Sequence, residues 1–128
     1  MNYSQIIKAI PALVELKKMR LPYSIARDIH KMHKTFEAEF QFFAQEEAKL
    51  VNEYATKDEN GNPRITNEGR VSFENMEIKN KYSARIAELG ATDAKIEIPT
   101  IKLTSADIGN ELISAKTIEA LEGVITFE

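Results

Sequence analysis

The sequence contains no cysteine and no tryptophan, and only four prolines and five glycines. Without cysteine the chain can form neither disulfides nor thiolate nucleophiles, and it cannot hold zinc through sulfur ligands. No apolar run approaches the roughly 20 residues that a membrane span requires, and the first residues lack the basic-then-apolar layout of a signal peptide. We therefore expect a soluble, cytoplasmic protein.

Recognisable catalytic motifs are also missing. The chain has no phosphate-binding loop, no dinucleotide fingerprint and no Gly-x-Ser-x-Gly elbow. Glu46 and Glu47 are adjacent, so on a helix they point about 100° apart and cannot act as a carboxylate pair by themselves. The sequence predicts a protein that is not an enzyme and that has no cofactor.

Metal-binding patterns fail on inspection. His30 and His33 are the only histidines, and neither belongs to a Glu-x-x-His or His-Glu-x-x-His motif. A segment starting at Asp58 imitates a calcium loop, but glycine stands at its fourth position (Gly61) and at its twelfth (Gly69). We expect no metal, a simple turn after Asp58, and histidines that lie on the surface or in an interface, or that contact an anion or nucleotide.

Size and charge limit the possible classes further. The 128 residues, 43% of them hydrophobic, suffice for one core, so we predict a single domain over residues 1–128. The formal net charge of −3 argues against a general nucleic-acid binder that neutralises phosphates. A local basic surface remains compatible with this balance.

The dominant element is a predicted helix from Pro22 to Tyr54, which contains no glycine and no proline after its first residue. At about 1.5 Å per residue it would extend roughly 50 Å, whereas a domain of this size has a radius of gyration near 14 Å. Its apolar stripe should therefore be covered by other helices, by a second copy or by a partner, unless the helix ends or bends near its middle. The residues of this predicted oligomer interface are Ile29, Met32, Phe36, Phe40 and Phe43.

The segment before Pro22 predicts a short helix that starts close to Pro11 and runs to Met19, because a proline inside a helix costs about 3 kcal/mol. Residues 3–8 would then form a strand or a frayed turn. With the long helix, this short one should form a helical corner over residues 9–55.

After Tyr54 the sequence predicts a turn and a β-hairpin over residues 57–73, then a return helix over 74–89 that begins at Ser72 or Glu74 and is capped by Gly90. The tail over 94–128 should hold one edge strand or two short strands within 95–103, a short helix capped by Ser114, and a last strand at 124–127. The predicted fold class is α+β and mostly helical: a long antiparallel helical hairpin, a small β-hairpin at its tip and a short β/α C-terminal region.

Charge is segregated along the chain. Met1 to Thr35 holds seven basic and two acidic residues, and Phe36 to Asn62 holds seven acidic and two basic residues. Two long helices laid antiparallel would bring unlike halves together, which predicts a homo-oligomer. The alternative is that both halves are solvated surface.

A basic and aromatic group surrounds the start of the long helix and could bind an anion where the corner opens. The alternative is a solubilising surface. The residues of this predicted ligand site are Arg20, Tyr23, Arg27, His30, Lys31 and Lys34.

The order of segments resembles small proteins of unknown function that bacteriophages and prophages encode. The similarity extends from about Ile7 to Leu103 and is carried by Leu21-Pro22, by Glu46-Glu47 and above all by the turn from Asn52 to Pro63. A turn transfers no catalytic residue. The resemblance implies a setting: a phage protein that acts in the cytoplasm of the bacterial host.

Two functions follow from different classes. In the first, the protein is a non-enzymatic oligomeric binder that sequesters a host factor or an anionic, nucleotide-type immune signal, and so inhibits host defence. In the second, it is a phage structural or assembly protein that docks through its long helix.

Overall fold

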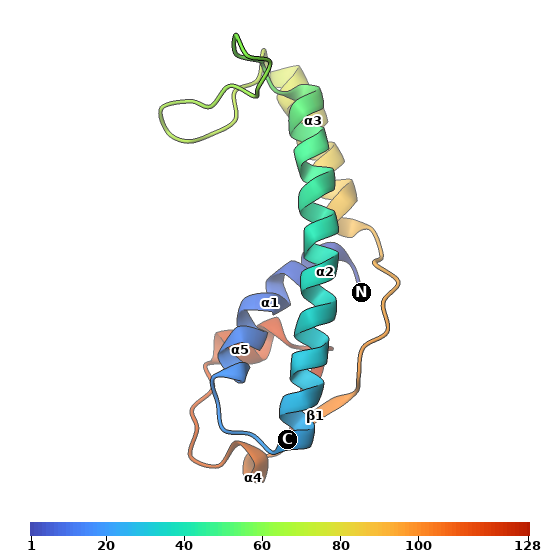
Figure 1. The fold of residues 1–128 in the computed structure, drawn as a ribbon, viewed down its shortest axis with the longest axis vertical. Helices are drawn as coiled ribbons and strands as arrows, with labels where there is room; N and C mark the ends of the chain where they lie inside the picture. Colours follow the sequence, from blue (N-terminus) through green and yellow to red (C-terminus); the bar gives the residue numbers. More distant parts are fainter. The chain divides into compact units, whose positions relative to one another are not determined.

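The computed structural model describes all 128 residues and is mostly helical, with one small parallel sheet (Figure 1). This composition agrees with the predicted α+β class. The elements are α1 (Tyr3–Lys17), α2 (Tyr23–Tyr54), α3 (Met76–Ala91), β1 (Ile101–Leu103), α4 (Ser105–Ile108), α5 (Ala115–Ala120) and β2 (Ile125–Phe127).

The chain divides into two compact units. Unit 1 comprises Met1–Phe40 and Asp93–Glu128, and unit 2 comprises Gln41–Thr92. The first half of α2 therefore belongs to unit 1 and its second half to unit 2. None of the helices has the length and apolar content that crossing a lipid bilayer requires.

In unit 1, α1 begins earlier than predicted. Asn2 Oδ1 accepts a hydrogen bond from the Gln5 amide at 2.9 Å, and Gln5 Oε1 accepts one from the Asn2 amide at 2.8 Å. This reciprocal capping box starts the helix at Tyr3, so the predicted strand or frayed turn over residues 3–8 is wrong, and Pro11 lies inside the helix.

Burial explains why α1 tolerates its internal proline. Four side chains on one face of the helix are completely buried, namely Ile6, Ala9, Leu13 and Leu16. Each of the three larger ones contributes about 1.5–3 kcal/mol, which together exceeds the roughly 3 kcal/mol that Pro11 costs. Tertiary packing therefore outweighs the local preference.

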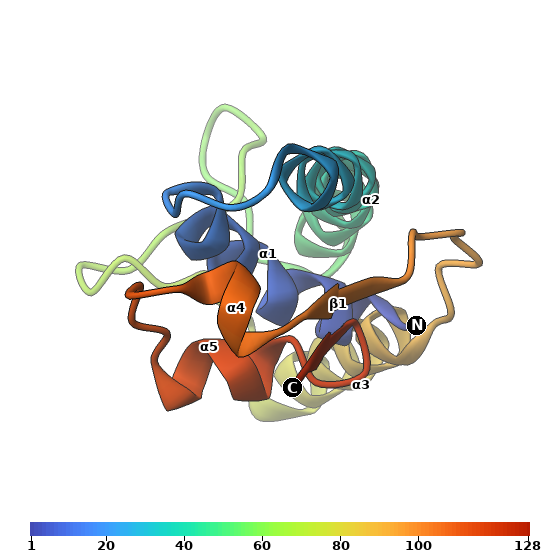
Figure 2. The ribbon, with the colours of Figure 1, turned by 90° about the horizontal axis from the view of Figure 1, so that it is seen from below.

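The layers of unit 1 are arranged around α1, which lies between α2 and the layer formed by α5 and the sheet (Figure 2). The sheet pairs β1 with β2 in parallel, with Ile101 opposite Ile125. The Ser114 side chain accepts a hydrogen bond from the Thr117 amide at 3.1 Å, so the predicted cap of α5 is confirmed. The predicted last strand is confirmed as β2, whereas within 95–103 only β1 is a strand.

In unit 2, the second half of α2 continues without a break to Tyr54, so the predicted long helix is confirmed. Asn75 caps α3 by accepting a hydrogen bond from the Ile78 amide at 2.9 Å, and the helix therefore begins later than Ser72 or Glu74. It ends at Ala91. Gly90 lies within it and is not its cap, because the Thr92 hydroxyl donates to the Glu88 carbonyl and closes the last turn.

The loop between α2 and α3 starts with the predicted turn. Asp58 Oδ1 accepts hydrogen bonds from the amides of Asn60 and Asn62, at 2.9 and 3.0 Å. The predicted β-hairpin is represented only by isolated antiparallel bridges, one of which joins Ile65 to Val71. The loop therefore holds no regular strand.

Candidate functional site on the first half of α2

The predicted ligand residues of α2 lie along one exposed face of the helix. Tyr23, Arg27, His30 and Lys34 follow one another at spacings of four, three and four residues, and Lys31 lies beside His30, so the five residues share a single stripe about 16 Å long. All are exposed to solvent, and the Tyr23 side chain is 94% exposed. We call this stripe the basic face; it consists of Tyr23, Arg27, His30, Lys31 and Lys34. The sixth predicted residue, Arg20, is exposed in the connection before the helix.

The opposite face of α2 fixes this orientation. Ile29, Met32 and Phe36 are at most 1% exposed and recur at spacings of three and four residues. Residues on the basic face lie about half a turn away from them, because successive helical residues are rotated by about 100°. Burial of the apolar stripe in unit 1 therefore directs the basic face to solvent.

No cation of the basic face is neutralised inside the chain. The ion pairs of the structure involve other residues, and neither Arg27, Lys31 nor Lys34 forms a side-chain hydrogen bond. Arg20 is likewise without an ion pair. The structure thus leaves a concentrated positive charge on one surface of unit 1.

Acidic residues of α2, unlike the cations of the basic face, form side-chain contacts within the chain. Glu39 accepts a hydrogen bond from the Tyr3 hydroxyl at 2.9 Å, and Glu46 pairs with Lys49 at 2.8 Å. Burial, together with the bond to Glu39, raises the pKa of the Tyr3 hydroxyl to about 12. These contacts reduce the acidic surface that a second copy of the helix would meet.

The two histidines, which the sequence placed together, have different environments. His30 is exposed, whereas His33 is only 8% exposed. The Lys17 ammonium donates to His33 Nδ1 at 3.0 Å, so in the neutral ring Nε2 carries the proton and lies 3.3 Å from a Glu37 carboxylate oxygen. This approach is not aligned as a hydrogen bond, which leaves His33 Nε2 unsatisfied. The spacing of four residues from buried Ile29 was the signal that could have placed His33 on the core face.

The predicted oligomer interface is largely internal. Ile29, Met32, Phe36 and Phe43 are buried within the single chain, and only Phe40, 38% exposed, presents substantial area to solvent. Of the three coverings expected for this stripe, the first, by the chain itself, therefore applies to four of the five residues predicted for an oligomer interface. The physical reason is that other segments of the chain cover the stripe.

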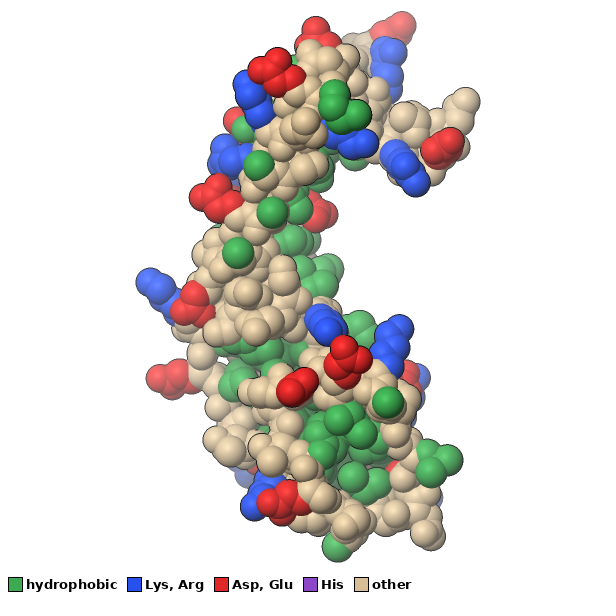
Figure 3. Space-filling model, turned by 180° about the vertical axis from the view of Figure 1, so that it is seen from behind, with side chains coloured by type: hydrophobic (Ala, Val, Ile, Leu, Met, Phe, Trp, Pro, Cys, Tyr) green, Lys and Arg blue, Asp and Glu red, His purple; other side chains and the backbone are tan.

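An apolar groove occurs elsewhere in unit 1, between α5 and β2. Ala115, Ile118, Ile125 and Phe127 line it, and Ile118 is 41% exposed. Figure 3 shows hydrophobic side chains gathered on the part of the surface to which these elements contribute. The exposed apolar surface of unit 1 thus includes α5 as well as Tyr23 and Phe40 of α2.

No three side chains of histidine, cysteine, aspartate or glutamate are grouped closely enough to hold a metal ion. Comparison of the chain with protein-family models, with curated proteins and with solved structures found no match.

Proposed function

We propose that the protein is a non-enzymatic binding protein that holds an anionic partner on the basic face of α2. One observation carries this proposal: Arg27, Lys31 and Lys34 are exposed on one face of a helix whose opposite face is buried, and they have no ion-pair partner. Cations arranged in this way favour association with a surface of opposite charge.

The curvature of the site favours a large partner. The outer face of a helix is convex, so its side chains diverge and cannot enclose a small molecule. An acidic protein surface can instead contact the whole stripe of about 16 Å. We therefore propose sequestration of a host factor with an acidic surface, in the bacterial cytoplasm that the resemblance to phage proteins implies.

A nucleotide-type ligand is the second candidate. It requires cations of two copies to converge, as they would if long helices paired antiparallel in a homo-oligomer. The segregation of charge along the chain favours that pairing. The internal contacts of Glu39 and Glu46 weaken it, because these acids already have partners.

The assembly alternative, docking through the apolar stripe of α2, has less support because most of that stripe is buried. We further propose that the second half of α2 and α3 form the predicted antiparallel helical hairpin. Two contacts support this pairing: the rings of Tyr54 and Tyr82 have centroids 6.4 Å apart, and Arg85 Nη1 donates to the Tyr54 hydroxyl at 3.4 Å.

The test is charge reversal on the basic face. We expect R27E/K31E/K34E to bind a fluorescently labelled 20-residue poly-glutamate peptide at least tenfold more weakly than the wild type, measured by anisotropy in 50 mM salt. A control, R64E/K81E/K116E, changes the net charge equally on exposed residues elsewhere and should bind like the wild type. Equal binding by both variants would contradict the proposal.

Two further measurements separate the candidates. Calorimetry of the wild type with a panel of phosphorylated nucleotides tests the proposal of a nucleotide-type ligand. That proposal is wrong if none of the nucleotides binds. Light scattering tests whether the anionic partner is a second copy: a dimer mass that falls to the monomer value in R27E/K31E/K34E would show that it is.

A further inference from the structure

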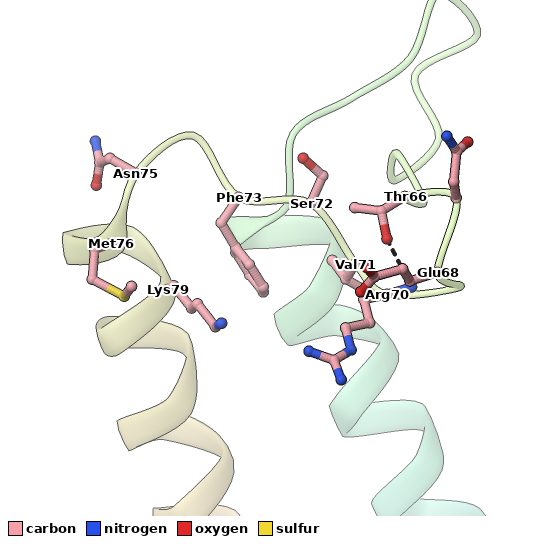
Figure 4. A pocket seen from close by; sticks show the side chains of 10 residues that line it. Thr66, Glu68, Arg70, Val71, Ser72, Phe73, Asn75, Met76 and Lys79 are labelled. Carbon is pink, nitrogen blue, oxygen red and sulfur yellow. Dashed lines mark hydrogen bonds between the residues drawn. The ribbon is translucent and has the colours of Figure 1, made fainter.

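Unit 2 contains an open cleft between the end of its long loop and the first turns of α3 (Figure 4). Its volume is about 650 Å³, which lies within the range of about 300–1,000 Å³ typical of small-molecule sites. The residues that line it and carry the argument are Thr66, Glu68, Arg70, Phe73, Met76 and Lys79.

Two cations extend into this cleft from different segments. Figure 4 shows the Arg70 side chain reaching in from the loop and that of Lys79 from α3. Neither side chain forms an ion pair or a hydrogen bond with the protein. Glu68 is the only acidic residue in the lining, and it pairs with neither cation, so the cleft has a net positive charge.

The backbone holds Arg70 in place. Its amide donates to Thr66 Oγ1 at 3.2 Å, and its carbonyl accepts from the Thr66 amide at 2.7 Å. Gly69, with a φ of +79°, makes the tight turn between these residues. The turn therefore fixes the backbone from which the Arg70 guanidinium enters the cleft, whether or not a ligand is bound.

The cleft also has an apolar side. The Phe73 ring packs against Tyr82, with centroids 5.0 Å apart and an interplanar angle of 41°. Phe73 remains half-buried, and Met76 is 65% exposed. An aromatic ring supported from behind and flanked by a flexible thioether is suited to contact a flat apolar group.

We propose that this cleft binds a small aromatic molecule that carries a phosphate group. Arg70 would donate two parallel N–H hydrogen bonds to the phosphate, Lys79 would add a point charge, and Phe73 would stack with the aromatic ring of the ligand. The cleft lies in a different unit from the basic face, and this proposal does not depend on the function proposed above.

Phenyl phosphate is the minimal probe, and inorganic phosphate and phenol represent its two halves. In ¹H–¹⁵N spectra of the full chain we expect phenyl phosphate to shift the amides of Arg70, Phe73 and Lys79, with a dissociation constant on the order of 1 mM. Each half alone should bind at least tenfold more weakly. Ring protons of the ligand should also show nuclear Overhauser effects to the Phe73 ring in the wild type, which tests stacking without a core variant.

A matched pair of variants separates the cleft from general charge. R70A/K79A should lose the shifts, whereas R64A/K81A removes the same charge from exposed residues outside the cleft and should keep them. Three results would each overturn the proposal: no shift at 10 mM phenyl phosphate, equal binding of inorganic phosphate, or equal loss in both variants.

Discussion

Replacing Pro11 with alanine should stabilise this protein, which is the opposite of the usual effect of a substitution. Pro11 lies nine residues into the 15-residue helix α1, where it lacks the amide that would donate to the Ile7 carbonyl. Alanine restores that donor. Because the Pro11 ring is exposed, little buried apolar area is lost with it.

The expected magnitude follows from helix propensity. Proline in a helix interior is about 3 kcal/mol less favourable than alanine, and α1 has already adapted to part of that cost. We therefore expect P11A to raise the free energy of unfolding by about 1–3 kcal/mol. At roughly 4 °C per kcal/mol for a chain of this size, the melting temperature should rise by about 4–12 °C.

Circular dichroism at 222 nm, followed during heating and in urea, measures both quantities. The control is P99A, because Pro99 lies outside any helix or strand, where loss of proline should destabilise by about 0.4–1 kcal/mol through the unfolded state. If P11A were neutral or destabilising like P99A, Pro11 would stand in a first helical turn or outside the helix, and the assignment of α1 would be wrong.

Two further predictions concern Tyr3 and the aromatic stripe of α2. Since the pKa of Tyr3 is raised to about 12, the folded state retains a proton that the unfolded state releases above pH 10. The stabilising contribution of Tyr3 should therefore be lost as the pH rises from 10 towards 12. The difference in urea stability between the wild type and Y3F should accordingly shrink between pH 9 and pH 11. A constant difference would contradict the raised pKa of Tyr3. F36A should cost about 3–5 kcal/mol, because Phe36 is completely buried, whereas F40A should cost under about 1 kcal/mol. Urea unfolding measures both losses of stability. A change in the oligomeric mass of F36A without destabilisation would instead place Phe36 in an interface.

The long helix was predictable because its local signals agree. Spacing, composition and the position of Pro22 all indicate α2, and the structure places its start at Tyr23. The Ser114 cap was predictable for a similar reason, since the capping residue and its partner Thr117 are only three positions apart.

The start of α1 was missed because two local signals conflict. The internal cost of Pro11 was given more weight than the capping box formed by Asn2 and Gln5, which the sequence contains. The deciding term is burial of Ile6 and Leu13, which depends on elements distant in the sequence. Propensity alone cannot supply that term.

Some features of the candidate sites could likewise be predicted from the sequence, and others could not. Exposure of the basic face could be inferred from helical spacing, because Arg27 and Lys34 lie opposite the apolar stripe. The environment of His33 could not be inferred in full, because its partner Lys17 comes from another helix. The cleft around Arg70 and Lys79 depends on how a loop folds back beside a helix, which no periodic pattern encodes.

The discontinuity of unit 1 has a consequence for protein synthesis. Its first stretch leaves the ribosome before all of unit 2, while β2, which completes the sheet with β1, is made last. α5, which packs against α1, begins 98 residues after α1 ends (115 − 17). At about 5–20 residues per second, α1 therefore waits roughly 5–20 s for it. During that interval the side of α1 that α5 covers is open to chaperones and to other nascent chains. Unit 2 is continuous in sequence and has no comparable delay.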